Sequence, residues 1–263
     1  MQLSAAALRS GAGQQRPHQT RRHHRHRSPG RGPRPGQVEK HHEYHQNDRE
    51  VRATIVRVIA AHLRPETEYS WSPNDFDFRT TYLEDADFQR ATFSGATRFN
   101  GTTFSGTARF ERATFSNTAR FGDATFSGSA RFGDATFSGS ARFDGATFSN
   151  TARFERAIFS GSAGCAGAIS SDTAWFDDAT FSNTTVFGDA TFSGTTVFGG
   201  ATFSGATIFE KVDFGAQPIS FANSKRWGPP APVFDWSVDI TLKPANVEPQ
   251  DWPPVVVSSV PSS

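Results

Sequence analysis

Phenylalanine recurs along this chain at a fixed period. From Phe88 to Phe159 the Phe residues alternate in steps of five and six positions, and the same rhythm resumes from Phe176 to Phe214. One full period is therefore one step of five plus one step of six, and 22 of the 26 Phe residues follow it. Self-similarity at a short fixed period predicts a solenoid, in which stacked repeats bury one continuous core.

Each period divides into two short segments, such as residues 119–123 (ARFGD) and residues 124–129 (ATFSGS). Side chains two positions apart in an extended segment point the same way, so Ala and Phe are predicted to point inward, and Arg, Thr and Ser outward. Gly, Asn and Asp follow each Phe by one to three positions. They are predicted to form the corners, because they adopt left-handed backbone most readily.

The interval after Phe159 keeps the same register. Continuing the steps of six, five and six positions places Cys165 and Ser170 in inward positions before Phe176. These two residues are therefore predicted to thin the core locally. A nucleophilic role is not favoured, because no His follows His62 and a buried apolar thiol is unreactive.

One helix is predicted ahead of the repeats. Asn47 is placed to cap it, Glu50 follows three residues later, and Pro65 ends it. The apolar positions at helical spacing are Val51, Ile55, Val58, Ile59 and His62 or Leu63. This face is predicted to cover the first coil, because the open end of a solenoid exposes core rings and unpaired backbone groups. A helix that binds a partner is the alternative.

The repeat units resemble those of pentapeptide-repeat proteins, whose unit is A-[D/N]-[L/F]-x-x, with one extra residue here in every second unit. Residues 48–65 followed by such repeats are similar to the actinobacterial members of that family. The resemblance implies a right-handed, four-sided β-helix with four units, and about 22 residues, per coil. Four Phe and four Ala per coil also suit a square interior.

A two-sided solenoid with a single period in each coil fits the repeat as well. The two folds differ in which rings stack at the strand spacing of about 4.8 Å. Phe137 on Phe115 would indicate four sides, and Phe126 on Phe115 would indicate two. We favour four sides, so the predicted fold class is an all-β repeat solenoid, a right-handed four-sided β-helix of about 22 residues per coil, with one N-terminal capping helix and irregular tails.

Four parts are expected along the chain. Residues 1–46 form a basic, His-rich disordered tail, residues 47–65 the capping helix, and residues 66–217 a β-helix of about six coils. Residues 218–263 form a tail rich in Pro and Trp, partly packed on the last coils. Six His residues of the first part form two clusters, His23, His24 and His26, and His41, His42 and His45. A metal site there is not favoured, because a flexible tail lacks fixed geometry, and no cofactor is predicted.

Charge and composition set limits on the function. The net charge is +1, with ten Lys or Arg against four acids in residues 1–50, but ten against twelve in residues 86–217. The repeats are thus nearly neutral. One Cys excludes an internal disulfide framework. No run of about 18 apolar residues exists, so no membrane span is predicted and a cytoplasmic location is expected.

The outward position before the inward Phe changes character along the repeats, and its ten residues form the candidate interaction surface. The first half carries Arg98, Arg109, Arg120, Arg131, Arg142 and Arg153, and the second half carries Trp175, Val186, Val197 and Ile208. Stacked Arg residues could attract phosphates or an acidic partner. The alternative is that neighbouring acids neutralise these Arg residues and form a solvated charge lattice with them. The apolar half is predicted to be covered by the C-terminal tail or a second protomer.

The sequence predicts a non-enzymatic scaffold that presents a rigid surface to a protein partner. The repeats contain no His, no metal-ligand spacing and no phosphate-binding Gly loop before a helix. A homodimer is a further expectation. Nucleic acid is not an expected partner, except for weak contact with the basic N-terminal tail. By family resemblance, the alternative is a topoisomerase-protecting DNA mimic of the quinolone-resistance type, which needs an acidic face. Rows of Thr-Phe-Ser, interrupted by Ile158 and Ile169, make binding of ice or carbohydrate a third and less favoured function.

Overall fold

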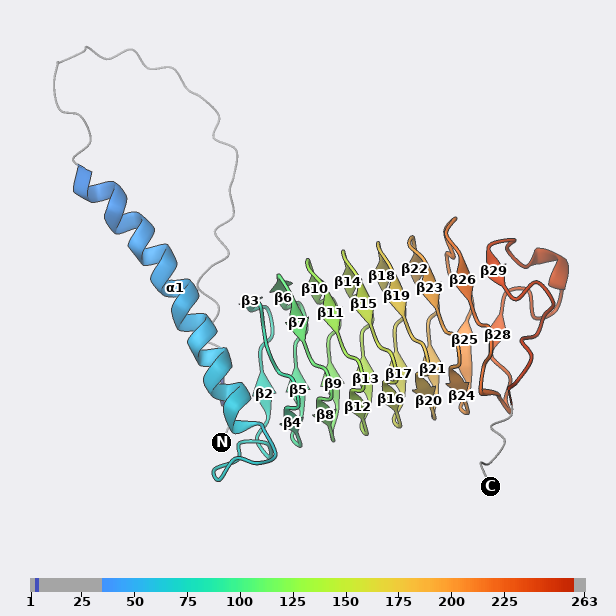
Figure 1. Ribbon diagram of the computed structural model, residues 1–263, viewed down its shortest axis with the longest axis horizontal. Coiled ribbons are helices and arrows are strands. Elements are labelled where there is room, and N and C mark those ends of the chain that lie inside the picture. Colours follow the sequence, from blue (N-terminus) through green and yellow to red (C-terminus); the bar gives the residue numbers. More distant parts are fainter. Residues whose placement is uncertain (1–2, 5–34, 258–263) are drawn as a thin grey trace, which may run out of the picture.

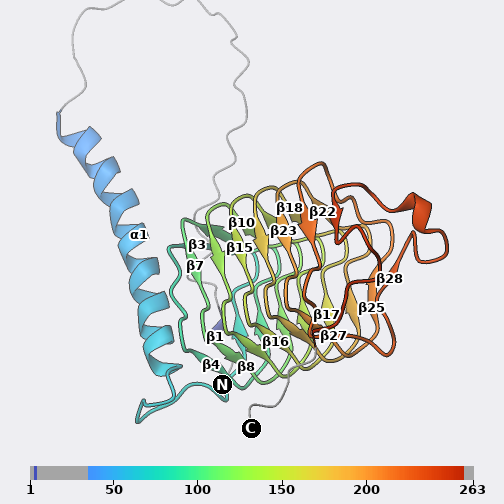
Figure 2. The ribbon, with the colours of Figure 1, turned by 45° about the vertical axis from the view of Figure 1, so that its right-hand side comes forward.

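A computed structural model describes residues 3–4 and 35–257 and shows a parallel β-solenoid of about seven coils, with about 22 residues per turn (Figure 1). Successive strands along the chain enter four different sheets in a repeating order. We name these sheets D, A, B and C in the order in which the chain visits them. Sheets A and C are therefore opposite sides of the solenoid, as are sheets B and D, and Figure 2 shows the stacked coils obliquely.

Sheets A and C hold the strands formed by the five-residue segments. Sheet A contains β1 (Leu3–Ser4), β2 (Phe76–Asp77), β5 (Thr97–Arg98), β9 (Ala119–Arg120), β13 (Ala141–Arg142), β17 (Ala163–Gly164), β21 (Thr185–Val186), β25 (Thr207–Phe209) and β28 (Val233–Phe234). Sheet C contains β7 (Ala108–Arg109), β11 (Ala130–Arg131), β15 (Ala152–Arg153), β19 (Ala174–Trp175), β23 (Thr196–Val197), β26 (Ile219–Ser220) and β29 (Val247–Glu248).

Sheets B and D hold the strands formed by the six-residue segments. Sheet B contains β3 (Tyr82–Glu84), β6 (Thr103–Ser105), β10 (Thr125–Phe126), β14 (Thr147–Phe148), β18 (Ile169–Ser170) and β22 (Thr191–Phe192). Sheet D contains β4 (Thr92–Phe93), β8 (Thr114–Phe115), β12 (Thr136–Phe137), β16 (Ile158–Phe159), β20 (Thr180–Phe181), β24 (Thr202–Phe203) and β27 (Arg226–Trp227).

Stacked Phe rings fill the interior. The rings of Phe115 and Phe137 lie parallel with their centroids 4.9 Å apart, and these two residues are register partners in sheet D. This contact confirms four sides and excludes the two-sided solenoid. Alternating polar and apolar positions thus produce a core made mainly of one residue type, in which each ring packs on the ring one coil away.

The core is thinner where Cys165 and Ser170 replace Phe, as the register predicted. Ser170 is buried and pairs with Phe148 on one side and Phe192 on the other. An apolar cavity of about 20 Å³ lies beside Ser170 and the half-buried Cys165. Two Phe rings are missing from their columns at this level, so the neighbouring rings lack stacking partners.

One kind of corner in the solenoid repeats a left-handed backbone. On sheets A and C, the residue two positions after each inward Phe, or after Cys165, has a positive φ. Such a residue recurs once in every period, from Arg90 to Lys211. Gly and Asp occupy most of these positions, as predicted, but Arg90, Arg112, Arg156 and Lys211 occupy the others. Such residues disfavour this conformation by about 1–2 kcal/mol, so the pairing of the surrounding coils must impose it.

The helix α1 (Pro35–His62) starts earlier than predicted. Asn47 therefore lies inside the helix and does not cap it, and residues 35–46 are helical where a disordered tail was expected. Pro35 suits the first position of a helix, because its missing N–H would have no partner there. Within the rest of the expected tail, Leu3–Ser4 pairs with β2 in sheet A, and residues 1–2 and 5–34 lie outside the described residues. The N-terminal half of α1 extends away from the solenoid (Figure 2).

The buried face of α1 overlaps the predicted one only in part. Ile59 and Leu63 join the core at the first coil as predicted, and Ile55 packs against it, but Val56 and Ala60 are buried in place of Val51 and Val58, which are 56% and 44% exposed. The carbonyl of Leu63 accepts the N–H of Thr92 at 2.7 Å, so the chain just after α1 begins the ladder of sheet D. This hydrogen bond fixes the helix rotation, which the apolar spacing alone did not.

The C-terminal segment continues the solenoid beyond the predicted limit at residue 217. The strands β26, β27, β28 and β29 extend sheets C, D and A, and a short 3-10 helix spans Ile240–Leu242. The end of the core is closed by Trp227, Trp236 and Trp252. The segment packs on the last coils by adding strands to their sheets.

Candidate interaction surface

The ten residues of the candidate surface lie on two opposite faces. Residues two periods apart stack, so Arg120 pairs with Arg142 in sheet A, whereas Arg131 pairs with Arg153 in sheet C. Sheet A carries Arg98, Arg120, Arg142, Val186 and Ile208. Sheet C carries Arg109, Arg131, Arg153, Trp175 and Val197. The structure therefore divides the predicted stripe into two surfaces.

Two further residues complete the outward column of sheet A. Gly164 stands between Arg142 and Val186, and Val233 follows Ile208 at the C-terminal end. We call the seven residues the A column: Arg98, Arg120, Arg142, Gly164, Val186, Ile208 and Val233. Counting whole periods along the sequence leads to Gly164. Val233 does not follow Ile208 by a whole number of periods, so only the strand pairing reveals it.

The basic residues of sheet C are largely neutralised by neighbouring acids. Arg131 lies 3.8 Å from Glu111, and Arg153 lies 3.8 Å from Glu155. Beside them, Arg156 donates two hydrogen bonds to Asp134, at 2.7 and 2.9 Å, and this contact lowers the pKa of the Asp134 carboxyl. Residues of both signs thus form a charge lattice on this face.

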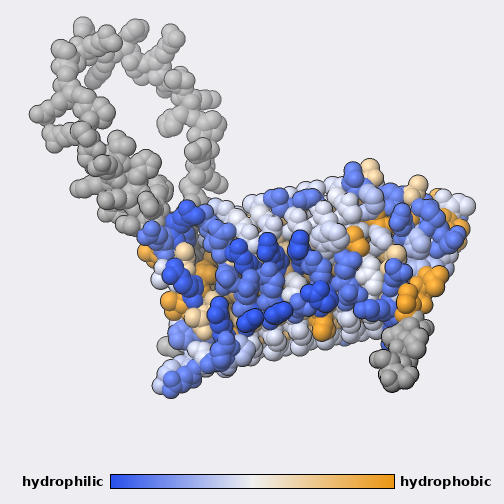
Figure 3. Space-filling view, viewed as in Figure 1, coloured by the Kyte–Doolittle hydropathy of each residue, from blue (hydrophilic) through white to orange (hydrophobic). Residues whose placement is uncertain are grey.

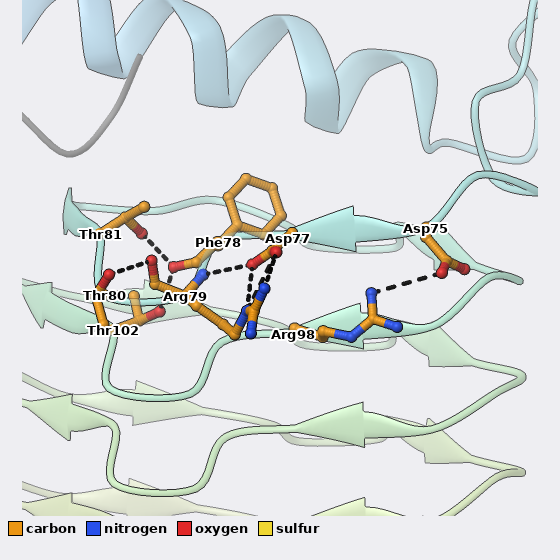
Figure 4. A network of polar contacts seen from close by, with 8 residues as sticks. All are labelled: Asp75, Asp77, Phe78, Arg79, Thr80, Thr81, Arg98 and Thr102. Carbon is orange, nitrogen blue, oxygen red and sulfur yellow. Dashed lines mark hydrogen bonds and ion pairs between the residues drawn. The ribbon is translucent and has the colours of Figure 1, made fainter. Parts of the chain in front are cut away.

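The first basic residue of sheet A also has an acidic partner. Arg98 lies 3.5 Å from Asp75, and Arg79 forms a bidentate pair with Asp77 on the adjoining strand (Figure 4). The hydroxyls of Thr81 and Thr102 both donate to the Phe78 carbonyl at 2.7 Å and hold these coils together. The N-terminal end of the A column is therefore neutral.

Arg120 and Arg142 differ from the other Arg residues of these faces, because both are exposed and neither forms an ion pair with any described residue. They are register partners on adjacent coils. Arg109 on sheet C also lacks an ion pair within the described residues, but it is half-buried, and its backbone pairs with that of Asp87 in an isolated β-bridge. Two adjacent unpaired guanidinium groups thus occur on sheet A.

A hollow follows Arg142 along the column. It has a volume of about 260 Å³ and is lined in part by Gly164, beside which the Asp144 carboxylate lies. Ser140, Ser162 and Thr184 line one side, and Asp144 lines the other. The Asp144 carboxylate accepts the N–H of Ala166 at 3.2 Å, which fixes the carboxylate beside Gly164.

The C-terminal half of the A column is apolar over three successive coils. Val186 and Ile208 are half-buried register partners, and Val233 beyond them is 40% exposed. The last coil adds Val233 to the column and so lengthens the apolar stripe that the C-terminal tail was expected to cover. In sheet C the equivalent stripe ends at Val197, because the next residue is Ser220.

The comparison with protein families matches this chain to a repeat family. The family described as "Pentapeptide repeats (9 copies)" matches residues 78–125, 121–169 and 171–213, together just over half of the chain. The chain belongs to the pentapeptide-repeat family. No match was found among curated proteins, and none was found among solved structures.

The other two faces of this pentapeptide-repeat solenoid carry outward Thr residues that are half-buried. The Thr rows are interrupted by Ile158 on sheet D and Ile169 on sheet B, which are 41% and 42% exposed. Figure 3 shows that hydrophilic side chains gather over the middle coils of one side of the molecule, while hydrophobic ones gather chiefly toward the ends.

A groove of about 360 Å³ separates α1 from the first coil of the pentapeptide-repeat solenoid. Arg49 bridges it with an ion pair to Glu84 at 2.8 Å. The remaining walls carry charges of both signs, such as Arg52 and Asp87. This groove therefore has no uniform charge that would select an anion or a cation.

Chemical groups for catalysis or metal binding do not converge in the described part of the chain. Burial raises the pKa of the Cys165 thiol well above its usual range, and the negative charge of Asp144 adds to this shift. No group of three or more His, Cys, Asp or Glu side chains is placed to hold a metal ion in residues 49–257. The predicted His clusters at positions 23–26 and 41–45 concern side chains outside this part. Within residues 3–4 and 35–257, no helix combines the length and the apolar character needed to span a membrane.

Proposed function

We propose that this pentapeptide-repeat protein is a non-enzymatic scaffold and that its A column binds a protein partner. The observation that carries the proposal is that one row holds unpaired Arg residues, then Gly164, and then three apolar residues, of which Val186 and Ile208 are half-buried and Val233 is exposed. Unpaired charges attract a complementary partner, and contiguous apolar residues on a soluble surface mark contact sites. Both features occur together on sheet A.

Rigidity supports the same function. The row is held by parallel pairing between every pair of adjacent coils, so Arg120, Arg142 and Ile208 keep fixed spacings before a partner binds. A preorganised surface loses less conformational entropy on binding than a flexible one. Sheet C offers a less open surface, because Arg131 and Arg153 already have acidic neighbours.

Neither alternative has comparable support. A topoisomerase-protecting DNA mimic needs an acidic face, whereas the outward row of sheet A carries Arg98, Arg120 and Arg142 on three successive coils. Binding of ice or carbohydrate needs long flat rows of Thr, and Ile158 and Ile169 interrupt both rows. We therefore retain protein binding through sheet A.

The experiment that tests the proposal compares opposite faces of the full chain. The double variant Arg120→Glu/Arg142→Glu is used as bait beside Arg131→Glu/Arg153→Glu, and quantitative mass spectrometry reads the captured proteins. The sheet A variant should lose the main captured protein, and the sheet C variant should keep it. Capture that survives the sheet A variant overturns the proposal.

A cytoplasmic location and a homodimer remain predictions of this proposal. Cell fractionation checks the first. Size exclusion with mass measurement checks the second, and it is also a control for the pull-down, because a dimer would change the number of A columns presented by each particle.

A further inference from the structure

We infer that the partner contributes an extended segment whose first part is acidic and whose second part is apolar, and that this segment lies along the A column. The inference rests on the proposed function and names the chemistry of the partner. It follows from three features that succeed one another along the row: unpaired Arg residues, a hollow and an apolar end.

The acidic part is required by Arg120 and Arg142. These two residues lie on paired strands of adjacent coils, about 4.8 Å apart along the row, and their guanidinium groups have no carboxylate partner among the described residues. Because Asp75 already neutralises Arg98, the attraction for an anion begins at Arg120. Planar guanidinium groups bind carboxylates through paired hydrogen bonds, so Asp or Glu side chains suit this end.

A small polar residue of the segment suits the hollow at Gly164. The hollow separates Arg142 from Val186 by two coil spacings, about 10 Å. Its walls offer the hydroxyls of Ser140, Ser162 and Thr184 and the carboxylate of Asp144. These groups can accept hydrogen bonds from a Ser or Thr hydroxyl, but a second carboxylate here would face Asp144.

The apolar part is required by Val186, Ile208 and Val233. Their side chains form a continuous stripe over three coils, and the next residues of the chain do not cover Val233. Aliphatic residues of a partner would remove this surface from water, with a gain of roughly 25 cal/mol per Å² of apolar area.

The length of the row sets the length of the segment. Five coil spacings separate Arg120 from Val233, which is about 24 Å at the strand spacing. An extended chain rises about 3.3 Å per residue, so about seven residues cover the row.

Nucleic acid fits the same row less well. A nucleic-acid site needs several phosphate contacts in succession, and here two unpaired Arg residues are followed by Asp144 and an apolar stripe. A protein segment accounts for both halves, whereas a polyanion accounts only for the first.

The experiment measures binding of fluorescein-labelled peptides to the full chain by fluorescence anisotropy. The probe peptide carries two Glu residues, a Gly-Ser step and three Val or Leu residues. The control peptides are a scrambled sequence of the same composition and a version with Lys in place of Glu. The probe should bind at least about tenfold more tightly than either control, because only its charges and apolar residues match the row in order.

Matched variants locate the peptide. Arg120→Glu should weaken binding of the probe about tenfold, while Arg131→Glu, in an identical pentapeptide on sheet C, should leave it unchanged. Val186→Asp and Val197→Asp form a second pair, since both lie in the local sequence TTVFG. Gly164→Val should weaken binding, because a Cβ at Gly164 would lie 2.6 Å from Asp144 Oδ1 and must displace that carboxylate within the hollow; a melting temperature like that of the unsubstituted chain shows that the coil stays folded.

The outcomes separate the inference from the proposed function. Equal binding of probe and scrambled peptide, no binding at millimolar concentration, or equal effects of paired variants each overturns the inference. Tighter binding of a single-stranded oligonucleotide than of the probe also overturns it. If the pull-down still depends on sheet A in any of these cases, the scaffold function stands and only the partner's chemistry is wrong.

Discussion

Arg120 and Arg131 occupy identical pentapeptides, ARFGD, yet they lie on opposite sides of the solenoid. The chain turns two corners between them, so residues one period apart never stack. Arg131 meets Glu111 at 3.8 Å, whereas no described acid lies within ion-pair distance of Arg120. One local sequence thus has two different electrostatic environments.

Charge reversal should affect stability differently at these two positions. Arg120→Glu should change the free energy of unfolding by less than about 0.5 kcal/mol, because it breaks no ion pair. Arg131→Glu should lower it by about 0.5–1 kcal/mol, since it replaces an exposed pair with repulsion from Glu111. Urea unfolding measures both values, and added salt should reduce the difference. Equal losses for the two variants would show that the lattice on sheet C contributes nothing.

The cavity in the core predicts a stabilising substitution. Ser170→Phe should restore the column between Phe148 and Phe192 and raise the free energy of unfolding by about 1–2 kcal/mol, because a buried ring adds apolar contacts. The loss of the Ser170 hydrogen bond to the Asp172 carbonyl is included in this figure. Thermal unfolding checks the gain, with the exposed Ser171→Phe as control. A lower midpoint for Ser170→Phe would mean that the local backbone has closed around Ser.

The raised pKa of the Asp177 carboxyl predicts that removing its charge stabilises the chain at neutral pH. Burial raises the pKa of its carboxyl, and repulsion from Glu155 and Asp178 adds to the rise despite an opposing backbone hydrogen bond. The folded chain therefore holds this proton more tightly than the unfolded chain. The contribution of Asp177 to the free energy of unfolding falls as the pH rises from its ordinary pKa of 3.8 through its raised pKa. This loss is complete above that pH window.

Asp177→Asn should accordingly raise the melting temperature at pH 7, and the advantage should disappear at about pH 3, where both states are protonated. Asp178→Asn is the control, because it removes the ion pair of Asp178 with Lys225 at 2.8 Å and the repulsion of Asp177, but leaves the larger cause, the burial of the Asp177 carboxyl, in place. Melting curves of the three proteins at both pH values give the answer. An advantage that persists at low pH would point to a cause other than the charge of Asp177.

Cys165 should react slowly while the chain is folded. Its thiol lines the interior cavity, and its raised pKa leaves little thiolate, the reactive form, at pH 8. Each unit of pKa rise lowers the thiolate population about tenfold under these conditions. Labelling with a thiol-reactive dye, followed with and without urea, checks this. Equal rates in the two solutions would place the thiol on the surface.

The rotation of α1 predicts which helix residues stabilise the first coil. Ile59→Ala should lower the free energy of unfolding by about 2–4 kcal/mol, because it leaves a cavity in the core. Val58→Ala, on the exposed side, should cost less than about 0.5 kcal/mol. Urea unfolding of both variants distinguishes this face from the one predicted by apolar spacing, for which Val58 would be as sensitive as Ile59.

The repeat sequence determined much of the fold. The period and the inward residues could be predicted, because every coil repeats the same local choices and local choices fix which side chains point inward. The stacking of Phe137 on Phe115 was expected from the family resemblance and the square interior, since the period alone also fitted two sides. Cys165 and Ser170 were placed in the core by the same count. The candidate residues of the outward position were also identified from their place before each inward Phe.

The tertiary structure alone decided how these outward residues combine. Only the pairing between coils separates Arg120 from Arg131, places Gly164 and Val233 in one row with Arg142, and shows that Arg98 has Asp75 as a partner. The helix rotation and the last coil, which depends on irregular spacings after residue 214, were likewise not encoded in the period. The physical reason is that side-chain direction is a local property of the backbone. The neighbour across a coil depends on how many corners the chain has turned.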